Sequence, residues 1–108
     1  MFSLIIPVHN RAGFLPRLFR SLDAQWLQPD ETILVDNASQ DGSYEICQDY
    51  AEKRKAEGMK VIVLRQEKAG ACAARNMGLQ AARGTYVFFF DSDDENFARL
   101  SEKHQSTD

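Results

Sequence analysis

Four short apolar runs, separated by segments with helical periodicity, constrain the fold of this 108-residue chain more than any other feature. Nearly every position in these runs is apolar, and many are β-branched or aromatic, which is typical of strands covered on both faces. The runs are Ser3–Val8, Glu31–Asp36, Lys60–Arg65 and Thr85–Asp91. The pattern therefore predicts four strands.

Between these runs, apolar residues recur at three- and four-residue intervals, as they do along one face of a helix. Three such stripes are present: Phe14, Leu15, Leu18, Phe19 and Leu22; then Ile46, Cys47, Tyr50 and Ala51; then the Ala-rich segment 71–82. Asp41-Gly42-Ser43 is expected to open the second helix, Gly58 to close it and Gly84 to end the third. Strand followed by helix, three times over, implies parallel strands with right-handed crossovers. We predict a single layered α/β domain over residues 1–108.

Composition limits the function classes. The chain is 44% hydrophobic and 27% charged, as expected for one globular domain, and its net charge of −3 argues against nucleic acid as a partner. Cys47 and Cys72 lack metal-site spacing, so we expect two reduced thiols, each a small core residue. No apolar run approaches the roughly 20 residues of a membrane span, and the start lacks signal-peptide features, so we expect the mature chain to begin near Met1.

Polar residues follow all four predicted strands. In an open parallel sheet, ligands bind beyond the carboxyl ends of the strands, so these positions matter most for function. They are His9–Arg11, Asp36–Ser39, Arg65–Lys68 and Asp91–Asp94. Ordinary turn chemistry also favours polar residues there, so this observation alone leaves both a binding site and plain loops open.

The last of these segments carries three aspartates within four positions, Asp91, Asp93 and Asp94. If the chain stays extended, the side chains of Asp91 and Asp93 lie on one side, with Cα atoms about 6–7 Å apart. Two carboxylates at that spacing can share one hard divalent cation, and oxygen donors favour Mg²⁺ or Mn²⁺ over zinc. A solvated acidic loop is the alternative interpretation.

Three stretches, in this order, resemble the amino-terminal half of the family 2 glycosyltransferases with the GT-A fold: "SLIIPVHNRAGFL", "ILVDNASQDGS" and "AGACAARNMGLQAARGTYVFFFDSDD". The resemblance covers the chain to Asp94 and implies a Rossmann-like three-layer α/β/α fold with a mainly parallel sheet. It also implies transfer of a sugar from a nucleotide-diphosphate donor, most often a UDP-sugar, to a hydroxyl of a saccharide, lipid-linked or other acceptor.

The resemblance assigns residues of the first two stretches to the nucleotide pocket. Pro7, His9 and Asn10 would line this pocket, and Asp36 and Asn37 would meet the base. Asn37 and Ala38 replace the family's more common second acid and glycine, although an Asn carbonyl can still accept a hydrogen bond from a uracil or thymine imide. His9 stands where the family commonly has an aromatic residue, and we expect it to be a packed or hydrogen-bonded loop residue.

The third stretch would supply the remaining contacts. Arg75 is assigned to the base or the diphosphate. Asp91, Ser92 and Asp93 match the DxD motif, in which Asp93 would ligate Mn²⁺ or Mg²⁺ and Asp91 would meet the metal or the ribose, with Ser92 beside the donor.

No residue after Asp94 supplies a convincing catalytic base, and family members continue much further. We therefore expect the chain to be the nucleotide-sugar-binding half of a cytosolic enzyme, truncated before the acceptor site and inactive alone. The acceptor could hold it at a membrane. The open sheet edge predicts dimerisation or poor solubility.

Two alternatives belong to other classes. A signalling receiver domain has similar length and an acidic metal site, but its acids should gather after the first strand, where this chain has His9 and Asn10. A non-catalytic binding module is the other alternative.

Overall fold

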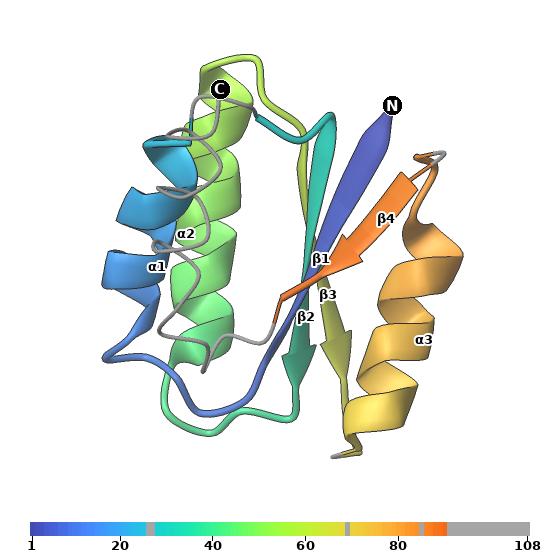
Figure 1. The fold of residues 1–108 in the computed structure, drawn as a ribbon. Coiled ribbons are helices and arrows are strands. Elements are labelled where there is room, and N and C mark those ends of the chain that lie inside the picture. Colours follow the sequence, from blue (N-terminus) through green and yellow to red (C-terminus); the bar gives the residue numbers. More distant parts are fainter. Residues whose placement is uncertain (26–27, 69, 85, 91–108) are drawn as a thin grey trace.

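The computed structural model describes residues 1–25, 28–68, 70–84 and 86–90, and over these it forms a four-stranded parallel sheet with helices on both faces (Figure 1). The strands are β1 (Phe2–Val8), β2 (Glu31–Asn37), β3 (Val61–Gln66) and β4 (Tyr86–Phe89), and the helices are α1 (Leu15–Asp23), α2 (Ser43–Ala56) and α3 (Ala71–Ala81). The predicted three-layer α/β/α fold is confirmed. The bounds predicted for β1, β2 and β3 are within one residue of those observed.

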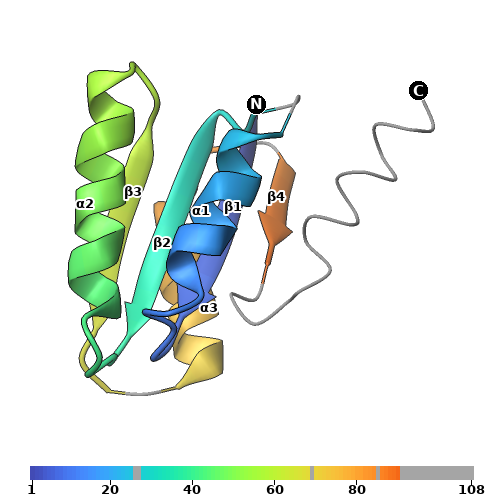
Figure 2. The same cartoon turned by 90° about the vertical axis from the view of Figure 1, so that its left-hand side faces the viewer.

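The strand order is β3-β2-β1-β4, so the chain crosses the sheet in one direction and then returns past β1 to place β4. Right-handed crossovers put the connecting helix on opposite faces when this direction reverses. Accordingly, α1 and α2 cover one face and α3 covers the other (Figures 1 and 2). A receiver-like order, 2-1-3-4-5, would place β3 rather than β4 beside β1. The receiver alternative is therefore wrong.

Two separate apolar clusters fill the layers on either side of the sheet. The larger one, under α1 and α2, contains the buried side chains Leu4, Ile6, Val8, Leu15, Leu18, Phe19, Leu22, Leu34, Cys47 and Tyr50. The smaller one, under α3, contains Ile5, Ile33, Val35 and Ala74. Consecutive residues of β1 and β2 thus alternate between the two clusters, as strand geometry requires. Among the described residues, no helix is long and apolar enough to cross a membrane.

The glycines that were expected to bound α2 do so. Gly42 precedes the helix with φ of 90°. Gly58 follows it with φ of 83°, and the N–H groups of Gly58 and Met59 donate to the carbonyls of Lys55 and Arg54 at 3.0 and 2.9 Å. This pair of bonds is a Schellman motif, whose left-handed residue favours glycine.

Three expectations fail within the described part of the chain. Gly84 does not end α3, which stops at Ala81; it lies against β1, where an added Cβ would sit 2.7 Å from the backbone nitrogen of Ser3. Cys72 is exposed near the start of α3, and only Cys47 is a core residue. β4 is the edge strand rather than a strand covered on both faces, and Tyr86, Phe88 and Phe89 are 66, 52 and 45% exposed.

Gly78 sets the distance between α3 and the sheet. It is a buried residue on the sheet-facing side of the helix, one turn after the fully buried Ala74. A Cβ at this position would lie 2.5 Å from Cγ2 of Ile5 and 3.2 Å from Cγ2 of Val35. Both neighbours are β-branched and fully buried, so their side chains have little freedom to move aside. Glycine here lets the helix backbone approach the sheet closely.

Gly78→Ala is expected to lower the free energy of unfolding by about 1–2 kcal/mol, because the overpacking cost exceeds the gain in helix propensity. Urea unfolding followed by circular dichroism measures this difference. The matched control is Gly13→Ala, since a Cβ at Gly13 meets nothing within 4 Å. A Gly78→Ala chain as stable as the wild type would contradict the close packing.

A buried carboxylate ties the amino-terminal ends of the strands together. Glu31, the first residue of β2, is 0% exposed. Its Oε2 accepts hydrogen bonds from the Ser3 hydroxyl and the Arg83 N–H, both at 2.5 Å, and its Oε1 lies 3.2 Å from Nζ of Lys60. Burial raises the pKa of Glu31, but the bonds from Arg83, Ser3 and Lys60 outweigh burial, so the pKa lies below its usual value.

Glu31→Gln is expected to destabilise the chain by about 2–3 kcal/mol at neutral pH. The substitution removes the negative charge that interacts with Ser3, Lys60 and the Arg83 backbone. Since the folded pKa is lowered, the carboxylate contributes stability above its unfolded pKa near 4.5, and this contribution is lost as pH falls through the folded value. Unfolding measured between pH 3 and 7 should therefore show a steeper acid loss for the wild type than for Glu31→Gln. The exposed Glu52→Gln is the control; equal acid slopes for wild type and Glu31→Gln would refute this assignment.

Candidate functional site

The carboxyl ends of β1 and β2 meet at one edge of the sheet, the lower edge in Figure 1, with β3 ending beside them. The strand order reverses between β1 and β4, and the crevice at such a switch point is where open α/β sheets bind ligands. We call the residues that follow the strands at this end of the sheet the carboxyl edge.

Pro7 lies where the pairing between β1 and β4 has ended. The carbonyls of Met1 and Ile5 accept hydrogen bonds from the N–H groups of Tyr86 and Phe90, so odd-numbered residues of β1 direct their backbone groups toward β4. Pro7 lies on this side, beyond the last β1–β4 pair, Ile5 with Phe89. A proline here costs no ladder hydrogen bond, although β1 is an inner strand.

The loops after β1 and β2 are bonded to each other. The Asn10 N–H donates to Oγ of Ser39 at 2.9 Å, and Oδ1 of Asn10 accepts from the Gln40 N–H at 2.8 Å. Asn10 and Ala38 both have left-handed φ values, 52° and 54°, which asparagine tolerates and alanine adopts at a cost. Asn10 therefore holds the loop after β2 in place through two hydrogen bonds.

Asp41 connects the loop after β1 to the start of α2 by hydrogen bonds. Its Oδ1 accepts from the N–H and hydroxyl of Ser43, and its Oδ2 accepts from the Ala12 N–H at 3.0 Å. The Ser43 hydroxyl in turn accepts from the Arg11 N–H at 2.8 Å. Hydrogen bonds from Ser43 and Ala12 hold the pKa of Asp41 below its usual value.

Asp36 is a fully buried carboxylate at the end of β2. Its Oδ2 accepts from the Ser39 N–H at 3.1 Å and lies 3.6 Å from the Arg65 guanidinium, whereas its Oδ1 has no hydrogen-bond partner among the described residues. Burial, and then the charge of Asp36, raise the pKa of the Cys47 thiol to about 12, so this cysteine is inert. The carboxyl edge thus contains an incompletely satisfied acceptor.

Arg65 is the charged partner of Asp36 and was not predicted as a site residue. It pairs with Asp36 across the β2–β3 register, stands 4.9 Å from the ring centre of Tyr44 and donates to the Ser39 carbonyl at 3.4 Å. The sequence marked Arg65 only as a polar residue after a strand. The register that sets it beside Asp36 is a long-range feature with no local signal.

Asn37 points away from Asp36, because consecutive strand residues face opposite sides of the sheet. Its side-chain Oδ1 accepts from the Gly70 N–H at 2.9 Å, directly before α3, and its carbonyl lies 2.6 Å from Nδ1 of His9. A carbonyl only accepts, so His9 donates through Nδ1. The expectation that His9 is a hydrogen-bonded loop residue is confirmed.

Within the part of the chain that it describes, the structure gives no polar contacts for the remaining predicted site residues. Arg75 is exposed on α3 and makes no hydrogen bond or ion pair with the described residues. Asp91, Ser92 and Asp93, the predicted metal-binding stretch, lie outside the described residues. Within the described ranges, no group of three metal-ligating side chains is found.

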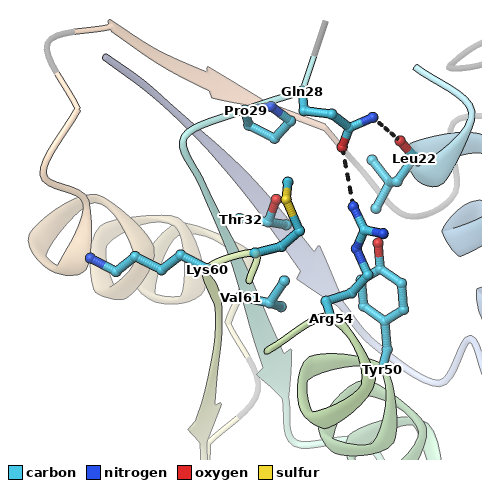
Figure 3. A pocket seen from close by; sticks show the side chains of 9 residues that line it. Leu22, Gln28, Pro29, Thr32, Tyr50, Arg54, Lys60 and Val61 are labelled. Atoms are coloured by element: carbon cyan, nitrogen blue, oxygen red, sulfur yellow. Dashed lines mark hydrogen bonds between the residues drawn. The ribbon is translucent and has the colours of Figure 1, made fainter. Parts of the chain in front are cut away.

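A small pocket lies at the opposite end of the sheet (Figure 3). Its lining includes Leu22, Gln28, Tyr50 and Arg54, and its volume of about 10 Å³ holds roughly one water molecule. Arg54 forms ion pairs there with Asp23 and Glu57 at 3.5 and 2.9 Å and donates a hydrogen bond to Gln28. The pocket is too small for a nucleotide and is separate from the carboxyl edge.

Comparison with known families shows to which family the chain belongs. The model of the family described as "Glycosyl transferase family 2" matches residues 3–105. The chain belongs to this family. Among curated relatives, it is 41% identical over 107 residues to the "Uncharacterized glycosyltransferase EpsJ" of Bacillus subtilis (strain 168), covering 95% of the chain and 30% of EpsJ. It is 38% identical to "Glycosyltransferase GlyG" of Streptococcus pneumoniae, covering 87% of the chain and 30% of GlyG.

Solved structures of this glycosyltransferase fold agree. The 1–349 fragment of S. aureus TarS, solved in complex with UDP, superposes with a TM-score of 0.74 at 30% identity, covering 96% of this chain and 31% of that fragment. The mannosyltransferase PcManGT of Pyrobaculum calidifontis, solved with GDP-Man and Mn²⁺, gives a TM-score of 0.76 at 25% identity, covering 85% of this chain and 27% of PcManGT. The family 2 chain thus spans about a third or less of the length of these relatives.

Ala38→Gly is expected to raise the free energy of unfolding by about 0.5 kcal/mol, because relief of the left-handed strain exceeds the entropy cost of glycine. The same substitution in the last turn of α2, Ala56→Gly, should lower it by up to about 1 kcal/mol. Thermal and urea unfolding measure both changes. A loss of stability of similar size in the two variants would contradict the strained loop.

Proposed function

We propose that this chain binds the nucleotide-sugar donor of a glycosyltransferase at the carboxyl edge. Membership of glycosyl transferase family 2 supports this function in general. The observation that carries the position of the site is the polar edge at the β1–β4 switch point, where the loops after β1 and β2 are bonded to each other. Polar loops that are bonded to each other suit a charged ligand whose base and diphosphate must be held apart.

In this proposal, Pro7, His9 and Asn10 form the wall contributed by β1, and Asp36 and Asn37 form the floor contributed by β2. Oδ1 of Asp36 is a buried acceptor without a hydrogen-bond partner in the described part of the chain, and such atoms are rare unless a ligand, water or further polypeptide donates to them. A UDP-sugar is the proposed donor, since TarS was solved with UDP. Arg75, exposed on α3, is proposed to meet the base or the diphosphate.

The proposed metal ligands are Asp93 and Asp91, with Ser92 beside the donor. Two carboxylates two residues apart are oxygen donors of the kind that Mn²⁺ and Mg²⁺ prefer, and PcManGT was solved with Mn²⁺. Asp91 directly follows Phe90 in the sequence, and the Phe90 N–H donates to the Ile5 carbonyl of β1 at 2.9 Å, on the side of β1 where the strand order reverses. When bound, the metal supplies Lewis-acid stabilisation of charge on the leaving diphosphate.

The broader setting follows from the same proposal. Nucleotide sugars are made in the cytosol, and we place donor binding there, with a saccharide, lipid-linked or other hydroxyl as acceptor. The exposed β4 aromatics Tyr86, Phe88 and Phe89 are a proposed contact for a second copy or for further polypeptide.

Isothermal titration with UDP, dTDP, GDP and ADP, with and without Mn²⁺, tests the donor site. We expect metal-dependent binding of UDP in preference to the others. Asp93→Ala should weaken it at least tenfold, because a charged metal ligand is lost. Asp49→Ala, an exposed aspartate on α2, is the matched control and should bind as the wild type does.

The two possible failures have different meanings. A folded chain that binds no nucleotide at millimolar concentration would refute donor binding by this chain. Binding that is unaffected by Mn²⁺ and by Asp93→Ala would leave the nucleotide site standing and refute the metal assignment.

A further inference from the structure

Gly70, the residue before α3, is held from two strands. Its N–H donates to Oδ1 of Asn37 at 2.9 Å, and its carbonyl accepts from Nε2 of Gln66 at 3.3 Å as well as from the Ala74 N–H in the first turn of the helix. Asn37 ends β2 and Gln66 ends β3. The start of α3 is therefore fastened to the carboxyl edge through side chains.

Asn37 is placed to act on α3 rather than on solvent. The residue is 8% exposed, and its amide oxygen already has the Gly70 N–H as its donor. Its own carbonyl is bonded to His9 after β1. One residue thus joins the end of β1, the end of β2 and the start of α3, and all three segments belong to the proposed donor site.

The observed hydrogen bond of the Asn37 side chain differs from the one expected from the sequence. The Asn37 carbonyl was expected to accept from the imide of a pyrimidine base. In the structure that oxygen faces the backbone of Gly70, on the side of the sheet opposite to Asp36. A bond to backbone carries no information about which base is bound.

We propose that Asn37 is a positioning residue, which anchors the first turn of α3 to the carboxyl edge and so fixes the place of Arg75. This inference rests on the proposed donor-binding function. Asn37 then contributes to the affinity for every nucleotide by the same factor and does not select the base. Its effect should pass through α3, so it should depend on the presence of Arg75.

Amide hydrogen exchange of the 108-residue chain tests the anchor without any ligand. Asn37→Ala is expected to speed exchange at the Gly70 N–H about tenfold, as loss of one hydrogen bond allows. Asn37→Asp keeps an acceptor oxygen at this position and should restore slow exchange. The internal control is the Ile46 N–H, bonded to Gly42 in the first turn of α2, whose exchange should not change.

Nucleotide titration then tests the role in binding. With Mn²⁺ present, Asn37→Ala should weaken UDP and GDP by the same factor, about three- to tenfold, and Asn37→Asp should recover most of the affinity. Arg75→Ala should cost less in the Asn37→Ala chain than in the wild type, because the two residues act along one path.

Three results would overturn the inference: Gly70 exchange unaffected by Asn37→Ala, a changed ratio of UDP to GDP affinity, or fully additive losses with Arg75→Ala. A changed ratio would assign Asn37 to the base. If the wild-type chain binds no nucleotide, the proposed function fails by that result, and the exchange of Gly70 still decides whether Asn37 anchors α3.

Discussion

β2 carries a fully buried carboxylate at each end, and the rest of the structure depends on how these two charges are accommodated. Burying a charge is costly unless hydrogen bonds or an opposite charge compensate it. At the amino end, Glu31 accepts hydrogen bonds from Ser3 and the Arg83 backbone and forms an ion pair with Lys60. These contacts hold together the start of β1, the start of β3 and the segment that follows α3. At the carboxyl end, Oδ1 of Asp36 has no hydrogen-bond partner among the described residues; Oε1 of Glu31 makes no hydrogen bond either, but it lies 3.2 Å from Nζ of Lys60.

The amino end of the sheet thus has a structural role, and the carboxyl end is where we propose that the donor binds. The amino end is closed by bonds between segments up to 81 positions apart, such as that from Gly84 to Ser3. At the carboxyl edge, the bonds instead run between the loops that follow β1 and β2 and hold these loops together. Parallel strands make this division possible, since all of their carboxyl ends lie on one side. The strained φ of Ala38 lies at this edge, where strain is retained for function more often than elsewhere.

Much of the fold could be predicted from local patterns. Apolar runs and helical stripes marked the strands and helices, and Gly42 and Gly58 marked the ends of α2, because these signals come from neighbouring residues. What the patterns missed depends on distant partners. The edge position of β4, the exposure of Cys72 and the contact of Gly84 with β1 all follow from which elements pack together, and single-segment periodicity does not contain that information. Arg65 was missed as the partner of Asp36 for the same reason.

The sequence by itself determined the class of fold, the family and the end of the sheet at which polar residues gather. These depend on periodicity and on the order of motifs, which survive without coordinates. Only the tertiary structure decided which partner each of two adjacent residues contacts. Asp36 and Asn37 are adjacent in sequence and were expected to serve one base, yet strand alternation sends Asp36 toward Arg65 and Asn37 toward Gly70. The partner on each face, which only packing supplies, sets the role of each side chain.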